Sequence, residues 1–403
     1  MSNVPEIRFK GYTDAWEQCK LGEVAETVIG GGTPNTANEE FWSGDIPWLQ
    51  SSDLTEHDFS VISARKHITK SGLNSSAAKL VSPDSIAIVT RVGVGKLAVV
   101  PFEYTTSQDF LSLSALKIDT HFGAYSMYRR LQKDLNQVQG TSIKGITKDE
   151  LLNKEIATPT SALEQTAIGN FFCTLDSTIT FYKRKLDGLR ELKKGYLQQM
   201  FPQNGERVPR LRFDGFTEDW QEYHMKDLVT LVVREVPKPE SAYIRLSVRS
   251  HAKGTFHQMV DDPSTIAMDK LFVVRKNDLV VNITFAWEHA IAVATDADDG
   301  LLVSHRFPTF LIDKSDVNFI KYSVSFEDFR YKMDLVSPGG AGRNRVLNKN
   351  DFMLIKIKAP QTIKEQSVIG SFFHSFDVQI DALQTKLDKL KYLKQAYLQK
   401  MFV

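Results

Sequence analysis

The most regular hydrophobic pattern in the chain is a heptad stripe that occurs twice. Apolar and aromatic residues alternate at steps of four and three along residues 164–201, and the same phase recurs along residues 365–402. The stripe consists of Ile168, Phe172, Leu175, Ile179, Tyr182, Leu186 and Leu189 in the first copy, and of Ile369, Phe373, Phe376, Ile380, Leu383, Leu387 and Leu390 in the second. A stripe sustained over about three heptads is typical of a coiled coil. We therefore predict two long helices that pair with each other.

A lysine interrupts the stripe at the same place in both copies. Lys193 and Lys394 occupy the next position of the seam, where an apolar residue is expected. The pattern predicts that the apolar stripe moves to the preceding residues, Leu192 and Leu393. Such a change of phase would alter the supercoil locally.

The two stripes belong to a tandem duplication. Nineteen of the 38 residues in 164–201 are identical to 365–402 at a constant offset of 201, and residues 5–16 match residues 209–220. Between these anchors the copies diverge into short β-branched runs separated by Gly, Pro, Ser and Asp, which are typical of strands. We predict an α+β fold with two globular domains in tandem, each followed by a long helix. The two helices are expected to pair as an antiparallel coiled coil with pseudo-twofold symmetry.

Composition excludes several classes of protein. The 50 basic and 49 acidic residues are balanced, so the chain is not a generic binder of polyanions. Cys19 and Cys173 provide neither a disulfide framework nor a thiolate metal site, so no structural zinc is expected. No basic and apolar leader opens the chain, and no apolar run is long enough for a membrane helix. These features favour a cytoplasmic protein.

The sequence also lacks the motifs of common enzymes. The segment Gly93-Val-Gly95-Lys-Leu-Ala98 fits a loose dinucleotide-binding pattern, but the residues that follow predict a strand where that site requires a helix. A phosphate-binding loop, a zinc-protease motif and a nucleophile elbow are all absent from the sequence. We therefore expect a protein with no catalytic residues and no metal site.

The repeated motifs resemble a known family. Each half ends in EQ-x-x-IG-x-FF followed by YLQ-x-MF, each opens on a P-x-(I/L)-RF motif, and the first half contains GGGTPNTANEEFWSGDIPWLQSSDL. This resembles the specificity subunit of bacterial Type I restriction-modification enzymes, which serve defence against foreign DNA. The resemblance implies target-recognition domains at 1–159 and 204–360, and conserved spacer helices at 160–203 and 361–403. Each domain would recognise half of a bipartite, asymmetric site in double-stranded DNA.

The resemblance also implies partners. Two methyltransferase (modification) subunits would dock on the conserved helices, and restriction subunits would join them for cleavage. S-adenosylmethionine, ATP and Mg would then be held by these partner subunits, and this chain would hold no cofactor. The residues expected for helix pairing and methyltransferase docking are Ile168, Phe172, Leu175, Ile179, Leu186, Ile369, Phe373, Phe376, Ile380 and Leu387.

Candidate DNA-binding residues lie in polar loops at the predicted strand ends. Glycine lets the backbone approach a phosphate closely, and Arg, Lys and Gln carry the donors that contact guanine and adenine edges. The candidates in the first domain are Thr33, Arg91, Lys96, Gln108, Thr141, Ser142 and Lys144. The candidates in the second domain are Arg245, Arg249, Trp287, His305, Arg306, Arg343, Asn344 and Arg345.

Three other functions remain compatible with the residues. A stand-alone DNA-binding regulator or adaptor would bind an operator tightly without any methyltransferase. A nuclease or methyltransferase would need a metal or S-adenosylmethionine site that the sequence does not display. A coiled-coil scaffold that binds only proteins would leave the divergence of the two globular parts without a reason.

Overall fold

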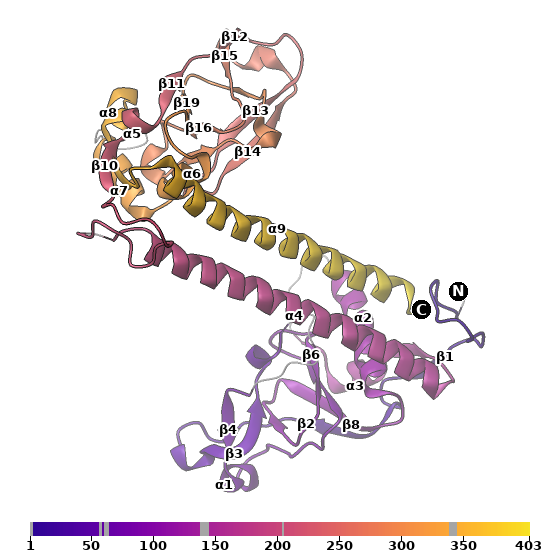
Figure 1. The fold of residues 1–403 in the computed structure, drawn as a ribbon. Coiled ribbons are helices and arrows are strands. Elements are labelled where there is room, and N and C mark those ends of the chain that lie inside the picture. The colour runs from indigo at the N-terminus through magenta and orange to yellow at the C-terminus, as the bar shows by residue number, and fades with distance from the viewer. Residues whose placement is uncertain (1–2, 56–58, 60–63, 138–144, 204, 338–344) are drawn as a thin grey trace. The chain divides into compact units, whose positions relative to one another are not determined.

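The chain folds into two compact units that do not follow its linear order. The computed structural model describes residues 3–55, 59, 64–137, 145–203, 205–337 and 345–403. Unit 1 comprises Met1–Lys185 together with Leu383–Val403, and unit 2 comprises Leu186–Ala382. Each unit therefore contains one globular domain, the first part of the long helix that follows it, and the last part of the other long helix (Figure 1).

Unit 1 is built on two sheets and a strand pair. A four-stranded antiparallel sheet has the order β2-β8-β5-β6, a second sheet has the order β4-β3-β7, and β1 pairs with β9. The strands are β1 (Glu17–Lys20), β2 (Ala25–Gly30), β3 (Trp42–Leu49), β4 (Lys66–Ile68), β5 (Ser85–Val89), β6 (Leu97–Val100), β7 (Thr105–Thr106), β8 (Phe110–Leu116) and β9 (Glu155–Thr158). The helices are α1 (Lys70–Asn74), α2 (Thr120–Gln137), α3 (Lys148–Leu152) and α4 (Ala162–Met200), which continues into unit 2.

Unit 2 repeats this plan with a larger second sheet. Its four-stranded sheet has the order β11-β19-β16-β17, its second sheet has the order β12-β15-β18-β13-β14, and β10 pairs with β20. The strands are β10 (Gln221–His224), β11 (Thr230–Val232), β12 (Glu235–Pro237), β13 (Tyr243–Val248), β14 (Thr255–Val260), β15 (Lys270–Val273), β16 (Asp278–Val281), β17 (Ile291–Val293), β18 (Leu302–Val303), β19 (Thr309–Leu311) and β20 (Lys356–Ala359). The helices are α5 (Met225–Leu228), α6 (Val317–Ser323), α7 (Glu327–Leu335), α8 (Lys349–Leu354) and α9 (Ile363–Lys400), which continues into unit 1.

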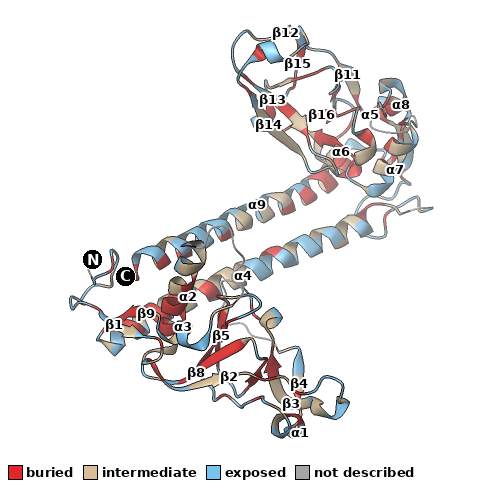
Figure 2. Cartoon of the chain, turned by 180° about the vertical axis from the view of Figure 1, so that it is seen from behind, coloured by how far each residue is buried: buried red, intermediate tan, exposed pale blue. Residues whose placement is uncertain are grey.

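The central strands are apolar on both sides because both faces of the four-stranded sheet are covered. In β5, Ile86 and Ile88 belong to the core that includes α2, while Ala87 and Val89 belong to the cluster that faces the second sheet. Figure 2 shows the resulting burial of β5 and β8. These two-sided strands explain the continuous β-branched runs in the sequence. The prediction of an α+β fold with long helices after each domain is confirmed.

The two long helices pair in opposite directions within each unit. In unit 1, the Tyr182 hydroxyl of α4 contacts the Lys386 ammonium of α9 at 2.6 Å, and Asp176 pairs with Lys394. In unit 2, Lys193 of α4 pairs with Asp377 of α9. Since partners earlier in α4 are matched by partners later in α9, the pairing is antiparallel. The prediction of antiparallel helix pairing is confirmed.

The predicted displacement of the stripe to Leu192 is wrong, while Leu393 is half-buried. Leu192 is 49% exposed, whereas Lys394 is only 5% exposed and lies in the seam. Each lysine remains in the seam because its ammonium forms an ion pair with an aspartate of the other helix. A tyrosine hydroxyl donates a hydrogen bond to the same aspartate. Tyr125 donates to Asp176 and Tyr322 donates to Asp377, each at 2.6 Å.

The opening motif of each half forms hydrogen bonds to the ends of the long helices α4 and α9. Arg8 binds Glu164 at the start of α4 through two hydrogen bonds of 2.6 and 2.8 Å, and the Ile7 amide donates to Lys400 near the end of α9. In unit 2, Arg212 binds Glu365 at 2.7 and 2.8 Å. Both glutamates are nearly fully buried, so the paired arginines remove the cost of an isolated buried charge.

Candidate nucleic-acid interface

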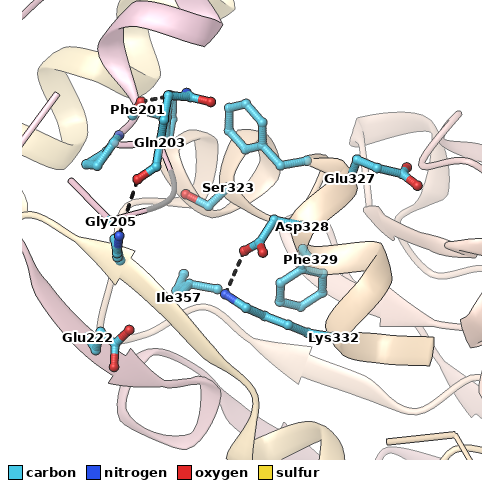
Figure 3. A pocket seen from close by; sticks show the side chains of 13 residues that line it. Phe201, Gln203, Gly205, Glu222, Ser323, Glu327, Asp328, Phe329, Lys332 and Ile357 are labelled. Atoms are coloured by element: carbon cyan, nitrogen blue, oxygen red, sulfur yellow. Dashed lines mark hydrogen bonds and ion pairs between the residues drawn. The ribbon is translucent and has the colours of Figure 1, made fainter. Parts of the chain in front are cut away.

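A cavity of about 500 Å³ lies in unit 2, and charged side chains contribute to its lining. Glu222, Glu327 and Asp328 contribute acidic groups to its wall (Figure 3). Lys332 pairs with Asp328 at 2.6 Å, and Lys358 donates to the Glu206 carbonyl at 2.7 Å. Its lysines are therefore used within the unit. Among the described residues, no group of three or more His, Cys, Asp or Glu could hold a metal ion.

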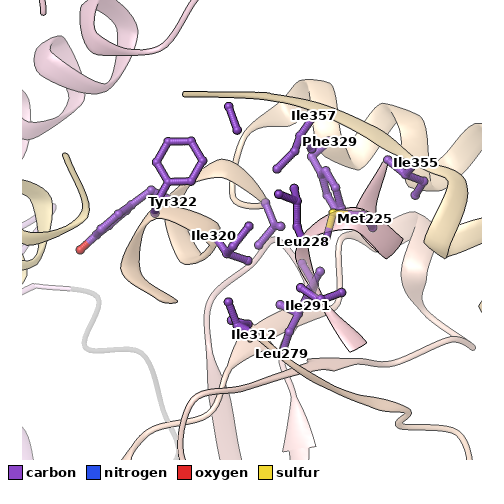
Figure 4. Close-up of a cluster of buried hydrophobic side chains, with 14 of the residues drawn as sticks. Met225, Leu228, Leu279, Ile291, Ile312, Ile320, Tyr322, Phe329, Ile355 and Ile357 are labelled. Carbon is purple, nitrogen blue, oxygen red and sulfur yellow. The ribbon is translucent and has the colours of Figure 1, made fainter. Parts of the chain in front are cut away.

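The loops at the ends of the sheets are better candidates for a functional surface, because packed apolar cores fix the strands that carry them. In unit 2, Leu279 of β16 and Ile291 of β17 pack with Met225, Ile320 and Phe329 in one apolar cluster (Figure 4). Close packing of this kind fixes the positions of the strands and hence of the loops at their ends.

One end of the four-stranded sheet in unit 1 gathers three loops. β2 and β5 finish at this end, while β6 and β8 begin there. The loops are held to one another by main-chain hydrogen bonds: Thr90 donates to Asp109 at 2.7 Å, and Gly32 donates to Thr106 at 2.9 Å. We call residues 31–33, 90–96 and 107–109 the loop end of unit 1.

The loop end of unit 1 contains four of the predicted DNA-binding residues. Arg91 and Gln108 are exposed, and Thr33 is half-buried. Lys96 is also half-buried, and its ammonium donates to the Leu54 carbonyl at 3.4 Å. The predicted residues Thr141, Ser142 and Lys144 lie outside the described residues. The structure thus brings together residues that are far apart in the sequence.

The glycines of this loop serve packing within the domain. A Cβ atom on Gly31 would lie 1.9 Å from the Ser107 carbonyl oxygen, and one on Gly32 would lie 2.2 Å from Ala77. The Trp48 indole also donates to the Gly32 carbonyl at 2.9 Å. These contacts give a structural reason for the glycines that does not involve phosphate.

The same end of the sheet in unit 2 gathers the corresponding loops. The Ile283 amide donates to the Arg306 carbonyl at 3.0 Å, and the amide of His251, in the turn between β13 and β14, donates to the main-chain carbonyl of Glu288 at 2.8 Å. The Leu347 amide donates to the Ile283 carbonyl at 2.9 Å, so the residues just before α8 also reach this end. We call residues 249–254, 282–290 and 304–308 the loop end of unit 2.

The predicted residues of the second domain have different surroundings. His305 and Arg306 are exposed at the loop end, as is Arg249. Arg345 pairs with Asp334 at 2.6 Å and stacks over Trp287 at 5.7 Å, so both side chains are engaged within the unit. Arg245 lies within β13. Arg343 and Asn344 lie outside the described residues.

A buried histidine supports the turn that carries Trp287. His289 is 3% exposed, has a positive φ of 64°, and places its Nε2 atom 2.6 Å from the Val324 carbonyl. Burial lowers the pKa of His289, although the contact with Val324 opposes this effect. A neutral ring can donate one hydrogen bond here without placing a buried charge.

The loop ends also expose apolar side chains that the sequence analysis did not select as candidates. Val92 is 71% exposed in unit 1 and Phe285 is 39% exposed in unit 2. Apolar side chains contact the methyl group of thymine in the major groove. In the sequence, each of these residues stands in a predicted turn between two strands. A search restricted to polar donors does not select such residues.

The residues predicted for helix pairing and docking are mostly covered within the units. Ile168 and Phe172 belong to the core of unit 1, and Ile369 and Phe373 belong to the core of unit 2. Phe376, Leu186 and Leu387 are also buried, while Leu175, Ile179 and Ile380 are half-buried. The other side of these helices exposes Phe181, Val378 and Tyr392, at 60%, 54% and 69%.

Comparisons with known proteins agree with the resemblance seen in the sequence. Residues 13–191 match the family model described as the Type I restriction modification DNA specificity domain. The specificity subunit of the Type I restriction enzyme MjaIX from Methanocaldococcus jannaschii is 27% identical over 186 residues, which cover 44% of this chain and 41% of that protein. The EcoR124I/EcoR124II specificity subunit from Escherichia coli is 33% identical over 100 residues, covering 23% of this chain and 24% of that protein. The alignments thus span less than half the length of either relative.

A solved structure shares the fold over nearly the full length. The crystal structure of a Type I restriction-modification S subunit from M. genitalium has a TM-score of 0.65 with this chain, at 13% sequence identity and with 99% of both chains covered. Among the residues described here, none of the helices is both long and apolar enough to span a membrane.

Proposed function

We propose that this chain, whose residues 13–191 match the family model of the Type I restriction modification DNA specificity domain, is the DNA-recognition subunit of a Type I restriction-modification complex. Unit 1 and unit 2 would each recognise one half of a bipartite, asymmetric site through their loop ends. The chain itself would be non-catalytic and hold no cofactor. S-adenosylmethionine, ATP and Mg would belong to partner subunits.

The observation that carries this proposal is the contrast between scaffold and loop ends. The two units share the paired Arg–Glu contacts and the Lys–Asp–Tyr contacts. Their loop ends instead carry different side chains: Arg91 and Gln108 in one, His305 and Arg306 in the other. Different donors at equivalent places are expected when two domains recognise different base patterns, because each base pair presents a distinct pattern in the major groove.

Docking of two methyltransferase subunits, and of restriction subunits with them, is supported by the outer side of the long helices. Exposed apolar residues such as Phe181 and Tyr392 lie on α4 and α9 beside many charged residues. Partners that supply phosphate contacts would also account for the net charge of only +1, since such contacts dominate affinity for DNA.

The test is co-expression with a candidate methyltransferase subunit encoded next to this chain. The mass of the complex would be measured in solution, and N6-methyladenine would be mapped in the host DNA by long-read sequencing. We expect two methyltransferases per chain and one asymmetric motif interrupted by a gap. A continuous motif would contradict recognition of two half-sites. Absence of a complex, together with tight operator binding by the isolated chain, would favour the stand-alone regulator.

A further inference from the structure

The β13–β14 hairpin of unit 2 packs apolar residues on both faces, and one face also carries polar side chains near the turn. On its inner face, Leu246 and Val248 belong to the apolar cluster between the two sheets. At its turn, Ala252 donates to the His289 carbonyl at 2.8 Å, which attaches the turn to the loop end of unit 2. The hairpin is therefore fixed on its inner face and at its turn, and its outer strand β14 forms the edge of the five-stranded sheet.

The other face of the hairpin buries Tyr243 and Val260, which are directly opposite each other, in a second apolar cluster, and carries half-buried polar side chains nearer the turn. Arg245 is directly opposite Gln258, and Ser247 is directly opposite Phe256, so these four side chains lie on the same face. The Arg245 guanidinium donates to the Gln258 side-chain oxygen at 2.7 Å. Just after β13, the Arg249 guanidinium lies 5.1 Å from the centre of the Phe256 ring. Both guanidinium groups are thus held in defined orientations before any ligand binds.

These arginines do not serve as partners for buried carboxylates. Within the described part of the chain, neither Arg245 nor Arg249 forms an ion pair, whereas Arg212 and Arg234 each bind a carboxylate that is almost fully buried. A guanidinium has five donors, and the contact with Gln258 uses an amide oxygen and leaves the amide NH2 group unused. The Arg249 guanidinium also donates to the Thr255 carbonyl, and the Arg245 Nε atom is buried without a partner among the described residues. Each guanidinium therefore retains donors that no described residue of the unit accepts.

The equivalent place in unit 1 is packed with aromatic residues. β3 and β13 each pair in parallel with a short strand on one side and antiparallel with a strand on the other. In this alignment Trp48 opposite Lys66 takes the place of Arg245 opposite Gln258. Trp48 is 4% exposed, and the Lys66 ammonium lies 5.3 Å from the Trp42 ring. The ordered donors are thus a property of unit 2.

We propose that the β13–β14 hairpin lies in the major groove of the half-site recognised by unit 2, with Arg245 and Gln258 contacting base edges. This inference rests on the proposed function as a DNA-recognition subunit. The major groove admits a two-stranded β-ribbon. Arginine binds guanine O6 and N7, and glutamine binds adenine N6 and N7. The half-site of unit 2 should therefore contain a guanine and an adenine that depend on these two residues.

The experiment compares Arg245→Ala and Gln258→Ala with the wild-type chain in the complete methyltransferase complex. Methylated motifs are mapped by long-read sequencing, and the half-site of unit 2 is the one that survives exchange of residues 20–150. Each substitution should weaken discrimination at one base pair of that half-site by roughly tenfold or more. The other half-site and the spacer should not change.

The control is Lys270→Ala, which removes an exposed ion pair with Glu235 on the same sheet and should leave both half-sites intact. Melting curves establish folding, and Arg245→Met retains the apolar stem if the alanine variant unfolds. Unchanged discrimination in folded variants would overturn the role of the hairpin and leave the proposed function standing. Relaxation of the other half-site would overturn it as well. A wild-type complex without any gapped motif would overturn both proposals.

Discussion

At the scale of single residues, Gly31 shows how closely the loop end of unit 1 is packed. A Cβ atom there would lie 1.9 Å from the Ser107 carbonyl oxygen, while a Cβ atom on the neighbouring Gly30 would meet nothing within 4 Å. Gly31→Ala should therefore lower the free energy of unfolding by about 1–3 kcal/mol, and Gly30→Ala should change it much less. Urea denaturation would measure both. Equal free energies of unfolding for the two variants would show that the close approach at Gly31 does not contribute to stability.

His289 should make unit 2 less stable in acid. Burial lowers its pKa in the folded state, so the unfolded chain binds a proton first, near the ordinary value of about 6.5. Stability that is present above this pH is lost as the pH falls through it toward the folded pKa. His289→Asn tolerates the positive φ and removes the titration. The melting temperature of this variant should fall less than that of the wild type between about pH 7.5 and 5.5; parallel curves would contradict this.

The sequence indicated loop residues but not their partners. Arg91 and Gln108 stand in polar turns next to recognisable strands, so their place at a strand end could be predicted. The ion pair between Arg345 and Asp334 could not be predicted, because the two residues belong to segments that are brought together only by tertiary packing. The donor pair of Arg245 and Gln258 likewise depends on the register of β13 against β14, which no motif in the sequence specifies.

At the scale of elements, the heptad pattern predicted both long helices, but it misjudged the lysines. An isolated lysine in an apolar stripe resembles a break in the pattern. The carboxylate that accommodates Lys394 comes from Asp176, on the helix of the other half of the chain. A helix pattern contains no information about such a partner, so the buried charge could be understood only from the pairing of α4 with α9.

This ion pair predicts a specific set of stability effects. Lys394→Met should lower the free energy of unfolding by about 3–5 kcal/mol, because Asp176 would remain charged at 3% exposure. Replacing both partners, with Asp176→Leu and Lys394→Met, should recover most of this loss, since apolar pairs often match buried ion pairs. Arg210→Ala, which removes an exposed pair with Glu206, should cost less than about 1 kcal/mol. Failure of the double variant to recover would mean that the ion pair is needed for a unique structure.

At the scale of the whole molecule, the duplication predicted two similar halves but not the exchange of helix ends between units. Leu383–Val403 belongs to unit 1 because Leu398, Met401 and Phe402 lie in its core. Met200 and Phe201 occupy the core of unit 2 in the same way. The sequence shows that YLQ-x-MF ends each half, but it does not show which core receives these side chains.

Exchange of residues 20–150 for the first domain of another family member should change one half-site only. The loop end of unit 1 lies within these residues, and the loop end of unit 2 lies outside them. The incoming domain must carry aromatic residues in place of Phe122 and Tyr125. Phe402 stacks on Phe122 at 5.5 Å, and Asp176 accepts a hydrogen bond from Tyr125. Mapping of N6-methyladenine checks the result, and a change at both half-sites would refute separate recognition.

The length of the long helices should determine the spacer between half-sites, but only if both helices change together. Seven residues inserted after Lys185 in α4 preserve the phase of the apolar seam. With α9 unchanged, the contacts Lys394–Asp176 and Lys193–Asp377 could not form in the same molecule, because each helix contributes to both units. The single insertion should therefore lose stability and methylation.

A second insertion of seven residues after Ala382 in α9 should restore both contacts. Each helix would then be longer by roughly 10.5 Å, which corresponds to about three base pairs at 3.4 Å per step. The doubly extended chain should methylate the same two half-sites with a spacer about three base pairs longer. An unchanged spacer in a folded, active complex would show that the helices do not set the distance. Full activity of the single insertion would show that the antiparallel contacts of the two units are not required together.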